Sequence, residues 1–507
     1  MKSLSQETCR PGAILWAFVT CHLVVWTLTP SLSQPNGPLD VFELLNWGSH
    51  WQWGYEKHPP LPAWIAEAFA QVAGKSVWGV YLASQIAVCA CFWAVWRFAR
   101  DSVSPAHALL SVLLLEAVYY YNYTSPEFRH DVLQLPIWAL TVLFLWRSLN
   151  SGRIGYWLLC GVMVGLGLLT KYNMMFLLVT WSVFMLVNSQ ARQHLAKPGP
   201  YVALSVAALI FAPHLLWLVD NGFPTITYAL ARAEGRGRLI DHLVYPVEFA
   251  LSQVLALVPL FILVGLLIPR STWNQGEATP RGFSRAFLFT AALGPFLVYL
   301  FASALIGFRL RSMWGTPLWS FIGVFIFFSV RPALTQKGLR RFTYAFFSFA
   351  ALWVISFIGQ FVVGPTLTGV VKRGHFPGQA IAAHVSTQWV KNYGRPLPIV
   401  GGDQWMAENI GFYSPDRPDV YTDLDPKKSP WTSDEDFERR GGVIIWSAVT
   451  DGNALPDPWR RRFPSAVVQP AASFAPQTSA AVPPVQIGWA IVAPASTLHP
   501  LSGSRRE

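Results

Sequence analysis

Residues 13–32 read AILWAFVTCHLVVWTLTPSL, and residues 39–64 read LDVFELLNWGSHWQWGYEKHPPLPAW. About 20 apolar residues cross the hydrocarbon core of a bilayer as a helix, so the first stretch predicts a membrane span. The second stretch brings carboxylates, cations and the pair Pro59-Pro60 directly after that span. Packing does not require such groups, so the two stretches together predict a membrane protein with chemistry at one membrane surface.

The composition of the whole chain agrees with a membrane protein. Of its 507 residues 53% are hydrophobic and 13% are charged, and the mean hydropathy is +0.35. Soluble domains carry about 25% charged residues. Apolar runs recur along the chain and predict about eleven spans. They lie near 13–32, 77–97, 106–122, 132–149, 155–170, 173–188, 200–219, 247–268, 286–306, 314–330 and 342–363.

The first run is not a cleaved signal peptide, because it is long, lacks a small-x-small site and is followed by further spans. Lys and Arg in the short loops favour a cytoplasmic N-terminus. With this orientation the outer loops mix both signs of charge, which indicates binding or catalysis on the outer face. The acids on that side are Asp40, Glu43, Glu56, Glu67, Glu127, Asp131, Asp220, Glu234 and Asp241.

The pattern changes after residue 364, and we divide the chain into a membrane domain, 1–364, and an extracytoplasmic α/β domain, 365–507. Helix and strand patterns alternate there, as in a small α/β module. The predicted elements are helices 379–390, 403–413 and 433–440 and strands 398–400, 419–421, 443–446 and 485–492. The Pro/Ala/Ser-rich segment 464–484 is predicted to be a loop.

The net charge of +11 and the pI near 9.5 do not indicate a nucleic-acid partner, because the cations are spread over many loops, where they anchor the topology. The five cysteines lie in or beside spans, show no metal-ligand spacing and form no disulfide framework. A P-loop is absent from the sequence, which disfavours a nucleotide-sugar donor.

Asp40 and Glu43 are the candidate catalytic residues. They lie three residues apart and share one face of a helix. Two neighbouring carboxylates either raise one another's pKa or jointly hold a divalent cation, and the sequence leaves both roles open. No other cofactor is indicated.

Aromatic and basic residues follow in the same loop. Trp47, Trp51, Trp53 and Tyr55 are spaced either as an interfacial belt or as a stacking wall for a sugar. Glu56-Lys57-His58-Pro59-Pro60 presents cations on a rigid turn that suits a phosphate.

Further basic groups fall at the outer ends of later spans. Lys171 either snorkels to the interface or contacts a ligand. Arg309 and Arg311 are either a lipid-headgroup anchor or a clamp for a carrier phosphate. His214 is as consistent with a helix–helix hydrogen bond as with a site role. Glu116, inside a predicted span, is expected to face the protein interior.

These motifs resemble the bacterial GT-C glycosyltransferases, the relatives of protein mannosyltransferases, aminoarabinose transferases and rhizobial galacturonosyltransferases. Asp40 followed by Trp53-Gly-Tyr and His58-Pro-Pro-Leu resembles their first periplasmic loop. Gly165-Leu-Gly-Leu-Leu-Thr-Lys171-Tyr172 resembles a second signature, and Phe128-Arg-His130-Asp131 with the downstream Leu-Pro-x-Trp-Ala resembles a third. The resemblance covers about residues 10–365.

The resemblance implies transfer of a sugar from a polyprenyl phosphate carrier to a lipid or glycan acceptor, at the outer face of the inner membrane and in contact with membrane lipids. It implies Asp40 as general base. Val41 stands where relatives often have a second acid, so Glu43 is expected to take that role. His58 rather than a lysine precedes the prolines, so either Lys57 or His58 contacts the phosphate. Lipopolysaccharide core or lipid A is the first expected acceptor.

Two rival functions remain open from the sequence. An oligosaccharide polymerase or ligase uses the same carriers and a long arginine-rich outer loop, which residues 220–246 meet in part. A transporter or flippase requires ionisable residues near mid-membrane, and here only Glu116 is clearly of that kind.

Overall fold

Two units make up the computed structural model, which describes residues 11–273, 282–479 and 481–495. The first unit comprises Met1–Pro30, Lys57–Pro62 and Tyr81–Phe357, and the second comprises Ser31–Glu56, Ala63–Val80 and Ile358–Glu507. By its contacts, most of the loop after the first span therefore belongs with the C-terminal residues.

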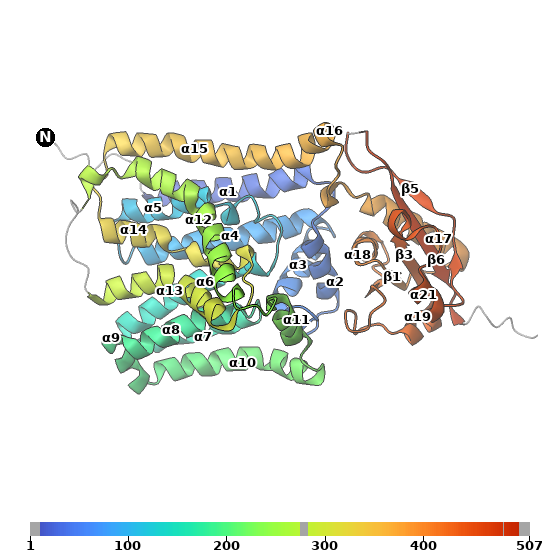
Figure 1. Cartoon of the computed structure of the whole chain (residues 1–507), viewed down its shortest axis with the longest axis horizontal. Helices are drawn as coiled ribbons and strands as arrows, with labels where there is room; N and C mark the ends of the chain where they lie inside the picture. The colour runs from blue at the N-terminus through green and yellow to red at the C-terminus, as the bar shows by residue number, and fades with distance from the viewer. Residues whose placement is uncertain (1–10, 274–281, 480, 496–507) are drawn as a thin grey trace, which may run out of the picture. The chain divides into compact units, whose positions relative to one another are not determined.

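The first unit is helical, and its long helices run alongside one another (Figure 1). Helix α7 packs between α6 and α10. The elements are α1 (Pro11–Ser33), α4 (Val77–Ala99), α5 (Pro105–Leu113), η1 (Leu114–Ala117), η2 (Tyr119–Tyr121), α6 (His130–Ser151), α7 (Ile154–Leu168), α8 (Met174–Val187), α9 (Ser189–Arg192), η3 (Gln193–Ala196), α10 (Gly199–Asp220), α11 (Pro224–Ala233), α12 (Asp241–Leu267), η4 (Arg270–Thr272), α13 (Gly282–Ile306), η5 (Ser312–Trp319), α14 (Ile322–Val330) and α15 (Gln336–Ile358).

Seven helices among the described residues are long and apolar enough to cross a membrane, or nine if two bent pairs each count as one span. The bent pairs are Met174–Val187 with Ser189–Ala196, at 94°, and Ser312–Trp319 with Ile322–Val330, at 49°. Two shorter apolar helices, Pro105–Ala117 and Ile154–Leu168, fall on the remaining predicted runs. The polytopic helical fold is confirmed, but the count of eleven spans is not.

The predicted run 106–122 shows why the count differs. Its α-helix ends at Leu113, and two short 3₁₀ segments follow, separated by Val118 in an extended conformation. Irregular backbone inside a membrane protein needs internal hydrogen-bond partners. Asn122 supplies one, because its Nδ2 donates to the carbonyl oxygen of Glu116 at 2.5 Å.

The second unit contains a small α/β sheet, as the alternating pattern predicts (Figure 1). The strand order is β2-β1-β3-β6-β4, with β5 also pairing with β6; β1 is parallel to β2 and β3, and β6 is antiparallel to its neighbours. The strands are β1 (Ile399–Gly402), β2 (Asp419–Thr422), β3 (Gly442–Ser447), β4 (Val467–Val468), β5 (Ala472–Phe474) and β6 (Val485–Val492). Two short strands thus fall in segment 464–484, where only loop was expected, because β6 offers them an edge.

Helices cover both faces of this sheet. One apolar core packs α17 (Gly378–Tyr393) and α18 (Gln404–Tyr413) against the sheet, and a second packs α19 (Asp434–Arg440) against the other face. The other helices are α2 (Leu39–Ser49), α3 (Leu61–Val72), η6 (Gly359–Val363), α16 (Gly364–Thr368), η7 (Arg373–His375), α20 (Ala448–Asp451) and α21 (Asp457–Arg462). Helices α2 and α3 cross closely at Gly48, where a Cβ would meet the carbonyl oxygen of Ala63 at 2.3 Å.

Candidate functional site

Lys171 and Asp131 form a buried ion pair in the first unit. Lys171 follows α7, Asp131 lies in the first turn of α6, and Lys171 Nζ is 2.7 Å from Asp131 Oδ1. Gln134 Nε2 also donates to the carbonyl oxygen of Lys171 at 3.1 Å, and the ammonium lies 5.9 Å from the ring centroid of Trp314. A carboxylate in the first turn is favourable because it faces the positive end of the helix dipole. The pair therefore fixes a cation at the junction of two helices.

The turn containing His58 packs beside this pair. The His58 ring centroid lies 3.9 Å from that of His130 and 5.6 Å from that of Tyr228. The backbone N–H of Leu61 donates to the carbonyl oxygen of Leu169 at 3.0 Å, which ties this turn to the segment that carries Lys171. The structure thus brings together residues of all three motifs on which the resemblance depends.

Burial disfavours the charged form of His58. Burial lowers the pKa of His58 well below its usual value, and the neighbouring basic groups lower it further. These groups are His130, Lys171, Lys57 and Arg232. Of the two candidate phosphate contacts, burial therefore favours Lys57 over His58 as the cation.

Arg232, Arg309 and Arg311 add positive charge to the first unit. The backbone N–H of Arg309 donates to the carbonyl oxygen of Ala233 at 2.9 Å, which joins its loop to the end of α11, where Arg232 lies. Burial lowers the pKa of Arg311, and the charges of Arg232 and Arg309 lower it further. In the part of the chain that the structure describes, none of the three forms an ion pair, and Arg311 Nε is buried without a hydrogen-bond partner. This arrangement can accept an anion.

Tyr172 has a different environment from its neighbour Lys171. Its hydroxyl lies 2.7 Å from Nε2 of His214 on α10, and burial raises its pKa well above the usual value. His214 thus has a hydrogen-bond partner within the protein, although the partner lies in the turn between α7 and α8 rather than on a second helix. A direct contact of Tyr172 with substrate stays a prediction.

Asp40 and Glu43 both lie on α2 in the second unit, but in unlike surroundings. Asp40 is half-buried in the first turn, whereas Glu43 is 9% exposed and accepts a hydrogen bond of 3.0 Å from Gln404 Nε2. Asp40 is thus the more accessible of the two. Among the described residues no three His, Cys, Asp or Glu side chains gather as a metal site, so a divalent cation on this pair stays a prediction.

The aromatic residues of the same loop divide into two groups. Tyr55 is buried, its ring stacks on Trp47 with centroids 5.1 Å apart, and its hydroxyl donates to the carbonyl oxygen of Trp47 at 2.6 Å. Trp51 and Trp53 are 49% and 44% exposed. If this loop stacks against a sugar, Trp51 and Trp53 are the accessible rings, and Tyr55 supports the loop from within.

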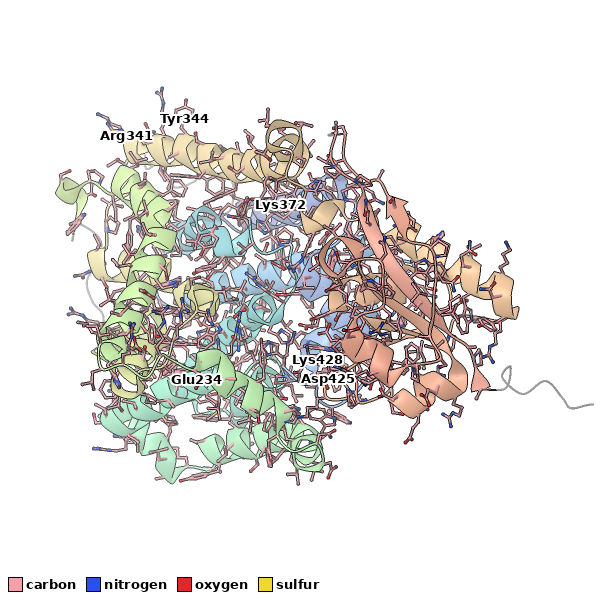
Figure 2. The ribbon with its side chains drawn as sticks, turned by 45° about the vertical axis from the view of Figure 1, so that its right-hand side comes forward. Glu234, Arg341, Tyr344, Lys372, Asp425 and Lys428 are labelled. Atoms are coloured by element: carbon pink, nitrogen blue, oxygen red, sulfur yellow. The ribbon has the colours of Figure 1, made fainter. Side chains whose placement is uncertain are left out.

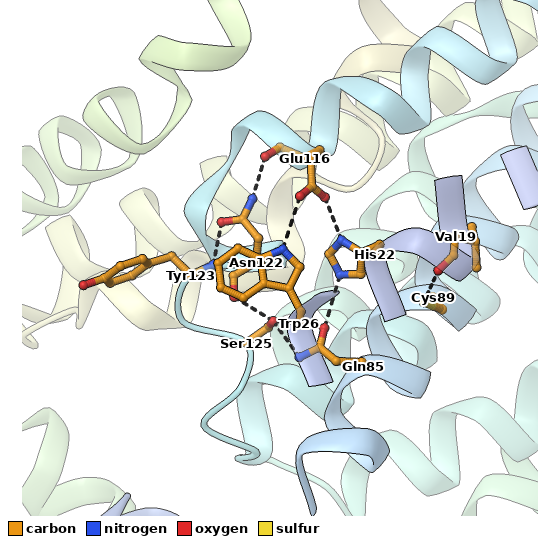
Figure 3. Close-up of polar contacts among 9 residues, drawn as sticks. All are labelled: Val19, His22, Trp26, Gln85, Cys89, Glu116, Asn122, Tyr123 and Ser125. Atoms are coloured by element: carbon orange, nitrogen blue, oxygen red, sulfur yellow. Dashed lines mark hydrogen bonds and ion pairs between the residues drawn. The ribbon is translucent and has the colours of Figure 1, made fainter. Parts of the chain in front are cut away.

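A buried polar network in the first unit was only partly foreseen from the sequence (Figure 3). Glu116 is 5% exposed; its Oε2 lies 2.8 Å from His22 Nδ1, and its Oε1 accepts from Trp26 Nε1 at 3.4 Å. The other ring nitrogen of His22 lies 3.2 Å from Gln85 Oε1. Glu116 could be singled out from the sequence because it is a lone acid inside an apolar run. Its partner His22 has no sequence feature that indicates this contact.

The network continues into the segment that leads to α6. Gln85 Nε2 donates to Ser125 Oγ at 3.1 Å, and Ser125 Oγ donates to the carbonyl oxygen of Asn122 at 2.8 Å (Figure 3). Ser84 Oγ donates to the carbonyl oxygen of Ser125. Six residues further along the chain is Asp131. The network therefore holds in place the irregular backbone that leads to Asp131, the acid of the ion pair with Lys171.

The second unit contains two Asp-x-Asp triplets, at 423–425 and 434–436, a pattern that can hold a nucleotide-bound metal. Asp423 pairs with Lys428 at 2.7 Å, and Asp434 pairs with Arg462. Asp436 pairs with Arg439 on its own helix. Asp425 accepts a hydrogen bond from the backbone N–H of Lys427 at 2.9 Å. The four acids thus have partners within the protein, so the triplets do not support a nucleotide-sugar donor.

Comparisons with known proteins agree with this fold. Residues 57–217 match the family described as dolichyl-phosphate-mannose-protein mannosyltransferase. The chain is 23% identical over 475 residues to the lipopolysaccharide core galacturonosyltransferase RgtA of Rhizobium johnstonii, covering 90% of both chains. It is 23% identical to RgtB of the same organism, with 80% of this chain and 82% of RgtB covered.

Among solved structures, ArnT from Cupriavidus metallidurans bound to undecaprenyl phosphate matches with a TM-score of 0.63 at 13% identity, over 96% of this chain and 99% of ArnT. Apo ArnT matches with a TM-score of 0.58. The chain is thus a polytopic membrane protein whose fold is similar to that of ArnT and whose residues 57–217 resemble the mannosyltransferase family. By sequence it is also similar to the rhizobial galacturonosyltransferases RgtA and RgtB.

Proposed function

We propose that the chain transfers a sugar from a polyprenyl phosphate carrier to lipopolysaccharide core or lipid A, at the periplasmic face of the inner membrane, with its C-terminal α/β domain outside the cytoplasm. The observation that carries this proposal is the group of cations in the first unit, Lys171 with Arg232, Arg309 and Arg311. Fixed cations stabilise the negative charge that a departing phosphate develops.

The reaction needs one bond made and one broken. An acceptor hydroxyl oxygen attacks the anomeric carbon, the bond from that carbon to the carrier phosphate oxygen breaks, and the carrier leaves as a phosphate monoester. Asp40 takes the hydroxyl proton as general base. The cations hold the phosphate while charge builds on it, and Lys57 supplies a further positive charge beside His58.

The relatives' names support this choice of substrates, because RgtA and RgtB act on lipopolysaccharide core and the matched ArnT structure contains undecaprenyl phosphate. A galacturonosyl unit is accordingly our first candidate for the sugar. The transporter alternative loses its main support, since the buried Glu116 is held by His22 and Trp26.

Mass spectrometry of envelope glycolipids, from cells with and without the protein, tests the proposal. We expect one sugar to disappear from the lipopolysaccharide core or lipid A when the protein is deleted and to return with the wild-type chain. Asp40→Asn should not restore it, because removing a general base lowers the rate about 10²- to 10⁴-fold. Asp451→Asn, at an exposed acid of α20, is the matched control and should restore it.

An unchanged glycolipid profile in the deletion strain contradicts the proposed acceptor. Accumulation of an unextended lipid-linked oligosaccharide instead indicates a polymerase or ligase. Normal glycolipid with membrane-inserted Asp40→Asn rejects Asp40 as the base.

A further inference from the structure

The second unit contains a polar cavity of about 340 Å³ that the proposed chemistry does not use. It is formed by α2, α3, α18 and the segment leading into β2, all within one unit. Its polar lining combines amide, hydroxyl, imidazole, basic and acidic side chains. Small-molecule sites start at about 300 Å³, so the cavity suits a ligand of the size of one sugar ring.

The cavity lies on a different face of α2 from the candidate base. At 3.6 residues per turn, Leu45 and Ser49 project about 140° and 180° around the helix from Asp40. Both line the cavity, whereas Asp40 does not. A ligand in this cavity therefore does not contact the face of α2 that carries Asp40.

The charges of the lining are largely balanced by the protein itself. Arg417 donates to both carboxylate oxygens of Glu67 at 2.8 Å, and Asp419 is 2.6 Å from Arg440. Glu67 is 3% exposed, so the carboxylate that fixes Arg417 is itself buried. An anionic ligand would have to displace these acids from Arg417 and Arg440. Among the described lining residues only the exposed Lys75 adds a cation without an ion pair, so the lining favours a neutral ligand over a phosphate or a carboxylate.

The remaining polar groups suit hydroxyls. Gln71 Nε2 donates to Glu67 at 2.9 Å and Asn46 Nδ2 to Thr422 at 3.5 Å, and each amide has a second N–H and an oxygen to offer. Lys75 offers an ammonium, and Glu408 is a buried carboxylate that accepts from Gln404. A sugar hydroxyl donates and accepts at once, so it can bond to either kind of group. Such a mixture of groups fits a polyhydroxylated ring better than a single charged group.

An imidazole ring forms one wall of the cavity. His50 stacks on Trp431 with ring centroids 4.1 Å apart and planes inclined by 17°. Burial lowers the pKa of His50 to about 4; nearby Asp419 opposes this shift and Arg417 adds to it. The ring is thus neutral at physiological pH and presents an uncharged, flat surface.

We propose that this cavity binds one neutral, polyhydroxylated sugar unit of the glycan acceptor and so helps to select that acceptor. The proposal rests on the proposed function for the nature of the acceptor, whereas the binding itself is independent of transfer.

Binding of methyl glycosides of neutral hexoses to the full chain in lipid nanodiscs, measured by saturation-transfer NMR, tests the proposal. Ser49→Trp places an indole at an exposed helical position on the cavity rim and should weaken binding at least tenfold. Ser465→Trp, at another exposed serine of the same unit, is the matched control and should bind like wild type. Gln71→Ala, at an exposed residue, should weaken binding about 2- to 10-fold through one lost hydrogen bond.

Galacturonic acid and inorganic phosphate serve as anionic probes. Tighter binding of either one at the cavity overturns the choice of a neutral sugar. Absence of glycoside binding to the wild-type chain, or equal binding by the Ser49→Trp and wild-type chains, overturns the cavity as a sugar site. Asp40→Asn should bind the glycoside normally, so a failure of the transfer proposal is distinguishable from a failure of this one.

Discussion

Two buried carboxylates of the first unit each lie beside a basic side chain, in unlike surroundings. Glu116 lies within an enclosed network, in which His22, Trp26 and Gln85 bond to it or to one another. Asp131 bonds to Lys171 at the junction of two helices. Arg232, Arg309 and Arg311, which form no ion pair among the described residues, add positive charge to the same unit.

The two carboxylates differ in whether the protein alone balances the charge around them. A buried charge is costly unless it is paired and hydrogen-bonded, and the Glu116 network meets that requirement internally. Around Lys171 the positive charge exceeds what the protein neutralises, which is expected where an anionic ligand completes the balance. We infer that Glu116 supports the fold and that Lys171 serves the ligand.

Within this comparison, the largest predicted effect concerns the Lys171–Asp131 pair. Lys171→Met leaves a buried carboxylate without its cation, which should lower the free energy of unfolding by about 3–5 kcal/mol. It should also weaken binding of the polyprenyl phosphate donor about 10- to 100-fold, as expected for a hydrogen bond to a charged group. Thermal unfolding and donor titration in nanodiscs measure the two effects.

The double variant Lys171→Met/Asp131→Asn distinguishes these two roles. Removing both charges should restore most of the stability without restoring donor binding. Recovery of both properties would mean that the pair is only structural, and the contrast with Glu116 would then disappear.

A smaller effect is predicted for the arginines that carry no ion pair. Arg309→Gln and Arg311→Gln should each raise the KM for the lipid donor about tenfold, the equivalent of about 1.4 kcal/mol, with little loss of stability. Arg341→Gln is the matched control, because Arg341 is an exposed arginine on α15 of the same unit (Figure 2). Equal KM values in all three variants would indicate that Arg309 and Arg311 only anchor lipid headgroups.

Much of the fold could be predicted from the sequence because its signals are local. Apolar length located every described helix that is long and apolar enough to cross a membrane, and alternation located β1, β2, β3 and β6. Breaks within spans were missed, since they depend on tertiary partners such as the Asn122 side chain that bonds to the carbonyl oxygen of Glu116. The strands β4 and β5 were missed because each is short and forms only against β6.

The site was predictable to the extent that its residues stand next to recognisable motifs. Lys171 and Asp131 were both named from the sequence, but their mutual bond, between residues forty positions apart, was not. Arg232 and His22 carry no motif of their own, and only the fold shows what they contact. Tyr55 matched a motif, yet its hydroxyl is bonded to the backbone of Trp47, which no residue pattern reveals.

The smallest predicted effect on transfer is that of Glu116→Gln. The amide keeps the size of the side chain and its bond to Trp26 but loses the charge beside His22, so the free energy of unfolding should fall by about 1–3 kcal/mol. The network acts on the site only through the backbone that leads to Asp131. The kcat and the KM for the donor should therefore each change less than about threefold, which is below the tenfold change that corresponds to about 1.4 kcal/mol. His22→Ala, which leaves the carboxylate without the imidazole, should destabilise the protein more than Glu116→Gln does. A well-folded Glu116→Gln protein without transfer activity would instead place Glu116 in the reaction, and the division between the two carboxylates would be wrong.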